Sequence, residues 1–343
     1  MVELKNITGS LLIDATAAFL NGAGLGAGED KNKVIPKTFK EKINGKAEDV
    51  PYVSAQSWRR WLRDTTNEEN KWNPSELRAI GAGSEKGSTN KIATELNPID
   101  FPEDDLFGYM KSGSGKEESI QRTSPFKTSI LKGIRGKRIM NNDEAFVHLK
   151  EGTPLPYSTR FYSAHLEGFF NLEFSRLGVY DNLGSHQELA KEFTEKYKDR
   201  LNESKIQYGT KFFPRYTLKD ADKIRKDRAS GLLKGLAFLR GGAKQAAFGS
   251  DVSPKVLILA GLSSANPVFN DLFEGNGEKP ALKIEALKQI KADYQSKLAT
   301  PIFIGIRSGY LQNEEAINKL TSEGFIIDSP VGVVNQIIKA HLS

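Results

Sequence analysis

Apolar and polar positions alternate with different periods along the chain, and these periods predict a mixture of strands and helices. Residues 3–20, "ELKNITGSLLIDATAAFL", and residues 255–261 are apolar runs typical of buried strands. Residues 157–180 alternate aromatic or aliphatic residues with polar ones, which indicates strands that cross a half-buried sheet. Residues 281–342 alternate helix and strand patterns. The pattern therefore predicts both sheet and helix along most of the chain.

Several polar or helical segments separate these elements. The connector at residues 21–32 is rich in glycine but lacks the Gly-Lys-Ser/Thr ending of a P-loop and the spacing of a dinucleotide-binding loop. Glycine and serine over residues 67–122 indicate an extended insertion. Basic, polar and turn residues over 123–160 predict a projecting hairpin or loop. Residues 185–205 and 219–240 have helical patterns, the first of them polar.

One predicted helix concentrates tryptophan and arginine. The stretch "PYVSAQSWRRWLRD", residues 51–64, predicts a helix that begins after Ser54, whose hydroxyl can accept a hydrogen bond from a first-turn amide. Cations near a helix N-terminus oppose the helix dipole unless an anion shares them. The polar face of this helix is therefore either a solvated basic surface or a phosphate-binding ledge. The apolar face gathers Trp58, Trp61, Leu62 and Thr65, and the polar face gathers Gln56, Arg59, Arg60 and Arg63.

The order of the elements predicts the fold class. Strand–helix–strand followed by a second strand–helix–strand, with large insertions in the connections, indicates an α+β domain of the ferredoxin or RNA-recognition type. Such a sheet can bind RNA by stacking bases on aromatic side chains, yet the octamer signature of ordinary RNA-recognition motifs is absent. Pattern alone therefore predicts a basic α+β protein with projections that binds nucleic acid.

The composition excludes several kinds of site and of protein. The 343 residues carry a net charge of +6, and 38% of them are hydrophobic. The chain has no cysteine, which excludes disulfides, thiolate zinc sites and cysteine nucleophiles. It has no apolar run of the ~18 residues that a membrane span needs, and its N-terminus, "MVELKNITGS", lacks the layout of a signal peptide. We therefore expect a cytoplasmic protein.

The positive charge is bunched along the chain, which suits a polyanion that follows a surface. The clusters are Lys31, Lys33, Lys37, Lys40 and Lys42; Arg59, Arg60 and Arg63; the run "KTSILKGIRGKR" from Lys127 to Arg138; and Lys223, Arg225, Lys226, Arg228, Lys234 and Arg240.

Five stretches in a fixed order resemble a known family. They are "FLNGAG…VIPKTF", which contains Asn21 and Lys37, "YVSAQSWRRWLR", "DDLFGYM", "FYSAHLEGFFNLEFSRLG" and "GGAKQAAFGSDVSPKVLILAG". Together they span about residues 3–262 and resemble the backbone subunits of type I CRISPR Cascade complexes, the Cas-seven family of the RAMP superfamily. The N-terminal pattern and "GGAKQ" resemble most the DevR branch, which is associated with type I-B systems.

The resemblance implies a hand-like fold and a scaffold role. It implies a ferredoxin-like palm from residues 1–66 and 161–343, a helical fingers insertion at residues 67–129 and a β-hairpin thumb at residues 130–160. It also implies a non-catalytic subunit that polymerises along CRISPR RNA, turns guide bases out at intervals and presents the others for pairing. The implied partners are the guide RNA (crRNA), target DNA through the guide duplex, further copies of the chain, and the other Cascade subunits, which are the 5′-end and 3′-end caps and the large and small subunits.

The resemblance further implies which residues contact the guide. Guides differ in sequence, so cations and backbone amides that hold phosphates suit the task better than groups that read base edges. Gly241 also fits the end of a helix, and the two roles are compatible. The implied RNA-binding residues are Asn21, Lys37, Ser54, Gln56, Arg59, Arg60, Arg63, Gly241, Gly242, Lys244 and Gln245, and the implied thumb residues at the RNA kink are Lys132, Arg135, Lys137 and Arg138.

Two alternative functions are a RAMP-type RNA endonuclease and a DNA-binding autoregulator. His165, beside Tyr162 and Arg160, is the one candidate for general acid–base catalysis, and Asp14 or Asp30 could imitate the aspartate of RNA-cutting relatives. No convincing helix-turn-helix spacing supports a regulator. We expect a protein that is not an enzyme and that holds no metal or cofactor. The histidines are scattered without metal-binding spacing, at His148, His165, His186 and His341.

Overall fold

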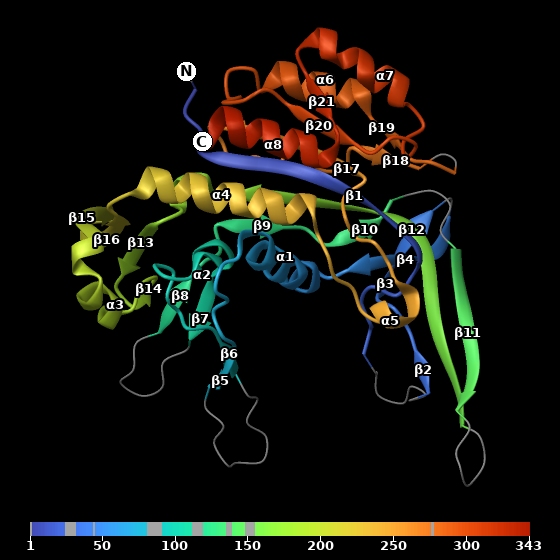
Figure 1. The fold of residues 1–343 in the computed structure, drawn as a ribbon, viewed down its shortest axis with the longest axis horizontal. Helices are drawn as coiled ribbons and strands as arrows, with labels where there is room; N and C mark the ends of the chain where they lie inside the picture. The colour runs from blue at the N-terminus through green and yellow to red at the C-terminus, as the bar shows by residue number, and fades with distance from the viewer. Residues whose placement is uncertain are drawn as a thin grey trace.

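The apolar run near the N-terminus forms β1 (Asn6–Ala18), the strand on which the largest sheet is built. It pairs antiparallel with β12 (Leu155–Leu172) on one side and with β17 (Val256–Leu262) on the other. The order across this sheet is β21-β20-β17-β1-β12-β10-β4-β3. Its outer strands, visible in Figure 1, are β3 (Thr38–Ile43), β4 (Lys46–Val53), β10 (Leu131–Gly133), β20 (Phe303–Ile306) and β21 (Ile326–Asp328). This is a computed structural model, and it describes residues 2–24, 32–43, 45–80, 91–111, 119–134, 139–147, 155–275 and 278–343.

Two long helices cover one face of this sheet, which we call the helix-covered face. They are α1 (Ala55–Asn70) and α4 (Ala221–Ala237), which pack against each other (Figure 1). Trp58 and Leu62 of α1 and Leu232 of α4 are fully buried between them and the sheet. In chain order, β1, α1, β10, β12, α4 and β17 give strand–helix–strand twice, the pattern of a ferredoxin-like domain. The predicted α+β fold is confirmed.

Segments from the C-terminal part of the chain cover the other face, which we call the C-terminal face. Successive residues of β1 point to opposite faces, so Leu11 joins the core under α1 and α4 whereas Leu12 joins a second core. This second core includes Phe269 and, from α6 (Ile284–Asp293), Leu287. In ordinary RNA-recognition motifs such a face stacks bases on aromatic rings. Here the part of this face around β17 packs against protein, so it is closed to such stacking.

The last third of the chain alternates helices and strands, as its pattern predicts. After β18 (Phe273–Glu274) and β19 (Ala281–Leu282), which pair with each other, come α6, β20, α7 (Glu314–Asn318), β21 and α8 (Pro330–His341). Strands β20 and β21 are parallel, and α8 packs against both α4 and β20. The C-terminal segments therefore extend the main sheet and pack on both of its faces.

A second, six-stranded sheet combines two distant parts of the chain. Its order is β15-β16-β13-β14-β8-β7, and its hydrogen bonding joins β8 of the insertion to β14, which follows β12. The family resemblance implies that residues 179–218 belong to the palm, whereas their strands share this second sheet with the insertion. Its strands are β7 (Tyr109–Lys111), β8 (Ile120–Arg122), β13 (Val179–Leu183), β14 (His186–Gln187), β15 (Leu201–Tyr208) and β16 (Lys211–Leu218).

The described residues between α1 and β9, and those of the segment 185–205, contain little helix. Between α1 and β9 (Phe126–Thr128), the described residues contain one helix, α2 (Pro102–Phe107), and two short paired strands, β5 (Arg78–Ile80) and β6 (Lys91–Ala93). The segment 185–205, for which the polar pattern predicts mainly helix, contains the short α3 (Lys191–Lys196) between strands. The prediction holds for most of residues 191–200, where α3 is followed by a short 3-10 helix (Lys198–Arg200). It is wrong for residues 201–205, because they begin β15 and pair with β16, and this pairing overrides local propensity.

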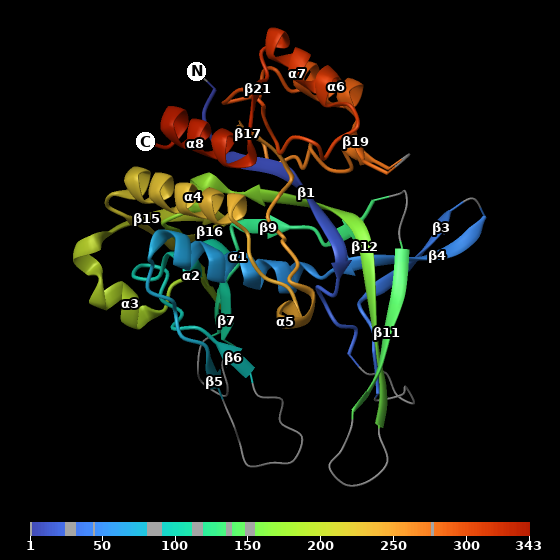
Figure 2. The same cartoon turned by 45° about the vertical axis from the view of Figure 1, so that its right-hand side comes forward.

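A long hairpin projects from the end of the molecule that lies opposite the second sheet (Figure 1). β11 (Ile139–Val147) pairs antiparallel with the first half of β12 over its whole length, and the two strands project together from the body of the molecule in Figures 1 and 2. The pattern over residues 123–160 thus correctly predicts a projecting hairpin. Its start is later than that range, because residues 131–133 pair in the main sheet as β10.

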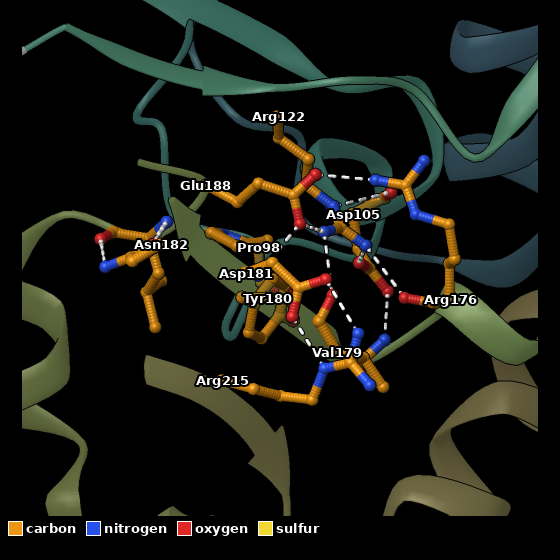
Figure 3. Close-up of polar contacts among 12 residues, drawn as sticks. Pro98, Asp105, Arg122, Arg176, Val179, Tyr180, Asp181, Asn182, Glu188 and Arg215 are labelled. Carbon is orange, nitrogen blue, oxygen red and sulfur yellow. Dashed lines mark hydrogen bonds and ion pairs between the residues drawn. The ribbon is translucent and has the colours of Figure 1, made fainter. Parts of the chain in front are cut away.

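A buried cluster of charges ties the second sheet to α4. Asp105 of α2 accepts hydrogen bonds from Arg122 of β8 and from Arg228 of α4. Glu188 accepts hydrogen bonds from Arg122 at 3.2 Å and from Arg176 at 2.5 Å (Figure 3). Each carboxylate therefore faces two guanidinium groups, so the buried charges compensate one another.

Candidate nucleic-acid interface

The N-terminus of α1 is fixed to the end of β1. Ser54 is the N-cap, as predicted, and its hydroxyl accepts a hydrogen bond from the amide of Ser57 at 3.4 Å. The amide of Ser54 in turn donates to Oδ1 of Asn21 at 3.0 Å. The first turn of α1 contains no acidic residue, so no side chain of that turn compensates the positive end of the helix dipole. The start of this helix can therefore receive an anion.

Three chain segments meet at the end of β1. The carbonyl oxygen of Asn21 accepts a hydrogen bond from the amide of Lys37 at 2.8 Å, and the carbonyl oxygen of Leu20 accepts one from the amide of Ala243 at 2.9 Å. Together with Ser54, these bonds bring the segments around residues 21, 37, 54 and 243 to one place. The sequence gives no spacing that reveals this convergence.

The glycine-rich loop after α4 lies directly against α1 and β1. Gly241 and Gly242 have φ angles of +148° and +112°. A Cβ atom on Gly241 would lie 2.3 Å from Cγ of Trp61, and one on Gly242 would lie 2.9 Å from a methyl carbon of Leu20. Both positions need glycine for this approach. The expectation that Gly241 ends a helix is wrong, because Phe238 already caps α4.

Lys244 connects this loop to the projecting hairpin. Its ammonium donates a hydrogen bond to the hydroxyl of Thr159 at 2.9 Å and lies 5.3 Å from the ring centre of Phe19. Thr159 belongs to the hairpin part of β12, where β2 (Lys33–Val34) runs parallel beside it. The side-chain amide of Gln245 donates to the carbonyl oxygen of Gly241. The Lys244 charge therefore lies at the junction of palm and hairpin.

Gln56 and Arg60 are the exposed members of the predicted polar face of α1. Arg60 Nε donates to Oδ2 of Asp64 at 2.9 Å, and both side chains are about half exposed. An exposed pair of this kind contributes little to stability. Arg60 can therefore exchange Asp64 for a phosphate at small cost.

Arg59 turns toward the insertion instead of solvent. It donates hydrogen bonds to the carbonyl oxygen of Phe107 at 3.1 Å, to the hydroxyl of Ser124 at 2.9 Å, and to the carbonyl oxygen of Phe126. Burial lowers the pKa of Arg59 to about 10. The prediction of one continuous open face is wrong here, because the insertion packs on this side of α1.

Arg63 also turns inward. Its guanidinium lies 2.6 Å from a carboxylate oxygen of Glu103 and 3.7 Å from one of Asp104, and its side chain is 12% exposed. Burial acts to lower the pKa of Arg63, but the hydrogen bond and charge of Glu103 outweigh it and raise the pKa above its ordinary value. The acidic start of α2 therefore already compensates this charge.

Lys132 is the one implied thumb residue within the described part of the chain. It lies in β10, opposite Glu167 of β12, and its ammonium is 3.5 Å from a carboxylate oxygen of Asp271. It shares the C-terminal face with Glu167 and lies outside the β11–β12 hairpin. The other three, Arg135, Lys137 and Arg138, lie outside the described residues.

A separate polar cluster lies on the C-terminal face. His165 of β12 is opposite Asp14 of β1, and its Nδ1 is 3.5 Å from Oδ1 of Asp14. The two side chains border a cavity of about 380 Å³ that Lys279 and Tyr310 also line. The sequence proposes Asp14 and His165 as separate candidates, and only the register of β1 and β12 brings them together.

Tyr162 and Arg160, expected beside His165, are an odd number of residues away on the same strand, so they point to the opposite face. Tyr162 is buried in the core with α1 and α4. Among the described residues, no three histidine, aspartate or glutamate side chains lie close enough to hold a metal ion. Asp30 and His148 are outside that part of the chain. None of the helices it contains is long and apolar enough to cross a membrane.

The fold described above also occurs in solved structures. Two chains in solved structures share it over 98% of this chain and 99% of their own length, at 12% sequence identity. One structure is described as a "CRISPR RNA-guided surveillance complex", with a TM-score of 0.53, and the other as a "CRISPR RNA-guided surveillance complex, pre-nicking", with a TM-score of 0.55. At this identity the likeness shows the fold alone.

Sequence similarity shows the family. Residues 8–279 match the family described as "CRISPR-associated negative auto-regulator DevR/Csa2", and the chain belongs to this family. The resemblance of the N-terminal pattern and "GGAKQ" to the DevR branch is thereby confirmed. No curated protein matches the sequence significantly.

Proposed function

We propose that this protein is a guide-RNA-binding backbone subunit of a CRISPR surveillance complex, and that it holds RNA phosphates without reading sequence. The observation that carries the proposal is the convergence of Asn21, Lys37, Ser54 and Lys244 at the foot of a projecting hairpin. Hydrogen bonds join Asn21 directly to the segments of Ser54 and Lys37, and Lys244 follows the Ala243 that binds the end of β1.

The groups at this junction suit phosphates. The uncompensated N-terminus of α1 and the cations of Lys37, Arg60 and Lys244 attract anions whatever bases they carry. Gln56 and Gln245 add neutral amides near the same point. Arg59 and Arg63 act indirectly in this proposal, because their bonds to the insertion fix the orientation of α1. Sequence specificity then comes from base pairing by the guide.

The shape of the molecule supports a scaffold role. The C-terminal face around β17 is packed against protein, whereas the β11–β12 hairpin projects from the molecule, as the β3–β4 hairpin also does (Figure 2). We propose that the β11–β12 hairpin reaches a second copy of the chain along the guide. Target DNA would be a partner through pairing with the guide, and other complex subunits would cap and flank the filament. The proposed role needs no catalysis.

The test is binding of two labelled RNAs with equal length and unrelated sequence over a salt series. Affinity for both should fall steeply and in parallel as salt rises, because counterion release depends on phosphates alone. A strong preference for one sequence would contradict the proposal. A duplex DNA of the same length is the third arm, and tighter binding to it than to either RNA would instead support a DNA-binding regulator.

RNA cleavage is a second candidate function, and the Asp14–His165 pair favours it. A histidine oriented by a carboxylate can act as a general base, and Lys279 or Tyr310 at the same cavity could assist a leaving oxygen. This candidate ranks second because the pair lies on the C-terminal face, whereas the proposed RNA junction lies at the N-terminus of α1.

A further inference from the structure

The β15–β16 hairpin carries the two most exposed large hydrophobic side chains in the described part of the chain. Tyr208 is 68% exposed and Phe212 is 65% exposed. The base of this ribbon is anchored by buried Leu201 and Leu218, but almost every residue from 202 to 212 is exposed. The tip therefore presents two aromatic rings to solvent.

The strand register divides the tip into two similar faces. Tyr208 is directly opposite Lys211, so this ring and this cation share one face. Phe212 is opposite Gln207, and Lys205 lies two residues before Gln207 on the same strand, so Phe212 and Lys205 share the other face. Each face of the ribbon therefore presents one aromatic ring and one lysine.

The sequence around the tip has an excess of positive charge, of which Arg200 and Arg215 are paired with Asp100 and Asp181. Residues 191–219 contain eight lysine and arginine residues against four aspartate and glutamate residues. Lys205 and Lys211 are both exposed, and neither forms an ion pair with a described residue. The tip thus combines aromatic rings with free cations, the combination with which proteins hold single-stranded nucleic acid by stacking bases and attracting phosphates.

A protein partner fits this tip less well. The two rings lie on opposite faces of a thin ribbon, so they do not form the continuous patch of about 800 Å² per partner that a stable protein interface buries. The open edge of β15 carries Glu203 and Lys205, and charged side chains at such an edge oppose pairing with another strand.

The ribbon also lies at the opposite end of the molecule from the proposed guide site. Figures 1 and 2 both show β15 and β16 at one end and the β11–β12 hairpin at the other. One strand of RNA held at the α1 junction therefore leaves the ribbon free for a second strand.

We propose that the tip of the β15–β16 hairpin binds single-stranded DNA, with one base stacked on Tyr208, another on Phe212, and the phosphates between them near Lys211 and Lys205. The choice of DNA rests on the proposed function, because pairing of a guide with one strand of a target duplex leaves the other strand unpaired. The site is independent of sequence, since every base offers an aromatic face to stack.

The test uses full-length protein first assembled on guide RNA, so that the guide site is filled, and then titrated with labelled oligo(dT). The Tyr208→Ala, Phe212→Ala double variant should lose at least about tenfold in affinity for oligo(dT), because each stacked base contributes ~1–3 kcal/mol. The ring-preserving exchange Tyr208→Phe with Phe212→Tyr should bind like wild type. Met110→Ala is the matched control, since Met110 is 61% exposed in the same sheet.

A Tyr208→Trp variant supplies a local readout, because stacking on oligo(dT) should quench the added tryptophan emission. Unchanged affinity in the double alanine variant, or no added quenching, overturns the proposal. Stronger quenching by oligo(U) than by oligo(dT) overturns the choice of DNA. If the double variant instead abolishes self-association in the absence of DNA, the tip is a protein contact and the proposal fails. Failure of wild type to assemble on guide RNA is scored separately and contradicts the proposed function.

Discussion

Asp105 of α2 and Arg228 of α4 form an ion pair that is closed to solvent, with side chains that are 0% and 5% exposed. The pair joins residues that are 123 positions apart in sequence. The other oxygen of Asp105 binds Arg122 of β8. A single carboxylate therefore connects α4 to β8 of the second sheet. Because Asp105 lies in α2, which packs against α1, these bonds also fix the position of α2.

Removing this carboxylate should weaken the fold strongly. Asp105→Ala leaves two buried guanidinium groups without their shared partner, which we expect to lower the free energy of unfolding by ~3–5 kcal/mol. Urea denaturation followed by circular dichroism measures this change. The matched control is Asp227→Ala, which breaks an exposed pair with Lys223 and should leave the unfolding midpoint unchanged. Equal midpoints for the two variants would contradict the assigned role of Asp105.

The sequence predicted the palm better than the second sheet for a physical reason. An apolar run such as residues 255–261 indicates a buried strand without any information from distant residues. The strands β1, β12 and β17 can therefore be predicted from the local pattern. The strands of the second sheet are short or exposed, and β15 has one buried residue at its start. Their pairing depends on contacts between distant segments, which no local pattern encodes.

Glu167 should make stability depend on pH. It is buried on the C-terminal face near Lys132, Asp271 and Lys283; Oε1 accepts a hydrogen bond from the amide of Leu272, while Oε2 has no partner among the described residues. Burial raises the pKa of Glu167 from 4.5 to about 7. Between these values the folded protein keeps a proton that the unfolded chain releases, so stability falls as pH rises through this window.

Glu167→Gln keeps the shape and removes this titration. The variant should match wild type near pH 4.5 and exceed it by roughly 3 kcal/mol at pH 8, since one pKa unit corresponds to ~1.4 kcal/mol. Denaturant unfolding of both proteins at the two pH values measures the difference, and titrations elsewhere cancel in the comparison. A stability difference that does not change with pH would contradict the assigned protonation.

Shortening the projecting hairpin should separate folding from assembly. Replacing residues 144–158 by an Asn-Gly turn joins Asp143 to its cross-strand partner Thr159 and keeps the contact of Thr159 with Lys244. The removed residues 144–147 and 155–158 pair with each other, and Ser158 adds one pairing with Lys33 of β2, so the thermal midpoint should change little. Ordered filaments on guide RNA should no longer form in electron micrographs. Filaments of normal order would show that the hairpin does not contact the next copy.

His165→Ala distinguishes the scaffold from the nuclease. In a scaffold, RNA that copurifies with the variant should have the same discrete length as RNA from wild type, because no residue of the chain cuts it. Asp14→Asn tests the same pair by removing the charge of the carboxylate, whose Oδ1 lies 3.5 Å from Nδ1 of His165. Gel analysis of the bound RNA measures the length. Longer or heterogeneous RNA in both variants would favour cleavage by the Asp14–His165 pair.

The predicted α1 face shows where helical periodicity stops being informative. Period alone correctly buries Trp58 and caps the helix at Ser54. It also groups Arg59 and Arg63 with Arg60, but it carries no information about what packs on that side. The insertion supplies carbonyl oxygens to Arg59 and a carboxylate to Arg63, and both are distant in sequence. Of these three arginines, Arg60 keeps the exposure that the pattern implies, as Gln56 also does.

Substitutions of Arg59 and Arg60 should therefore have different effects, the first on stability and the second on RNA binding. Arg59→Ala leaves the carbonyl oxygens of Phe107 and Phe126 without this donor, and it should cost ~1–3 kcal/mol of stability. Lys37 is partly exposed and Arg60 is exposed, so Lys37→Ala with Arg60→Ala should cost only ~0.5 kcal/mol per position. The same double variant should bind guide RNA weakly, and its slope of log affinity against log salt should drop by ~0.7 per lost phosphate contact.

The control for the double variant is Lys319→Ala with Lys339→Ala, which removes the same net charge from exposed positions in the C-terminal segments. A general loss of positive charge would weaken RNA binding equally in both double variants, because long-range attraction depends on the total charge. A site at the α1 junction would weaken it only in Lys37→Ala with Arg60→Ala. Fluorescence anisotropy over the salt series measures both slopes. If the two slopes agree with each other and with wild type, the α1 junction does not bind phosphates, and its polar face is a solvated basic surface.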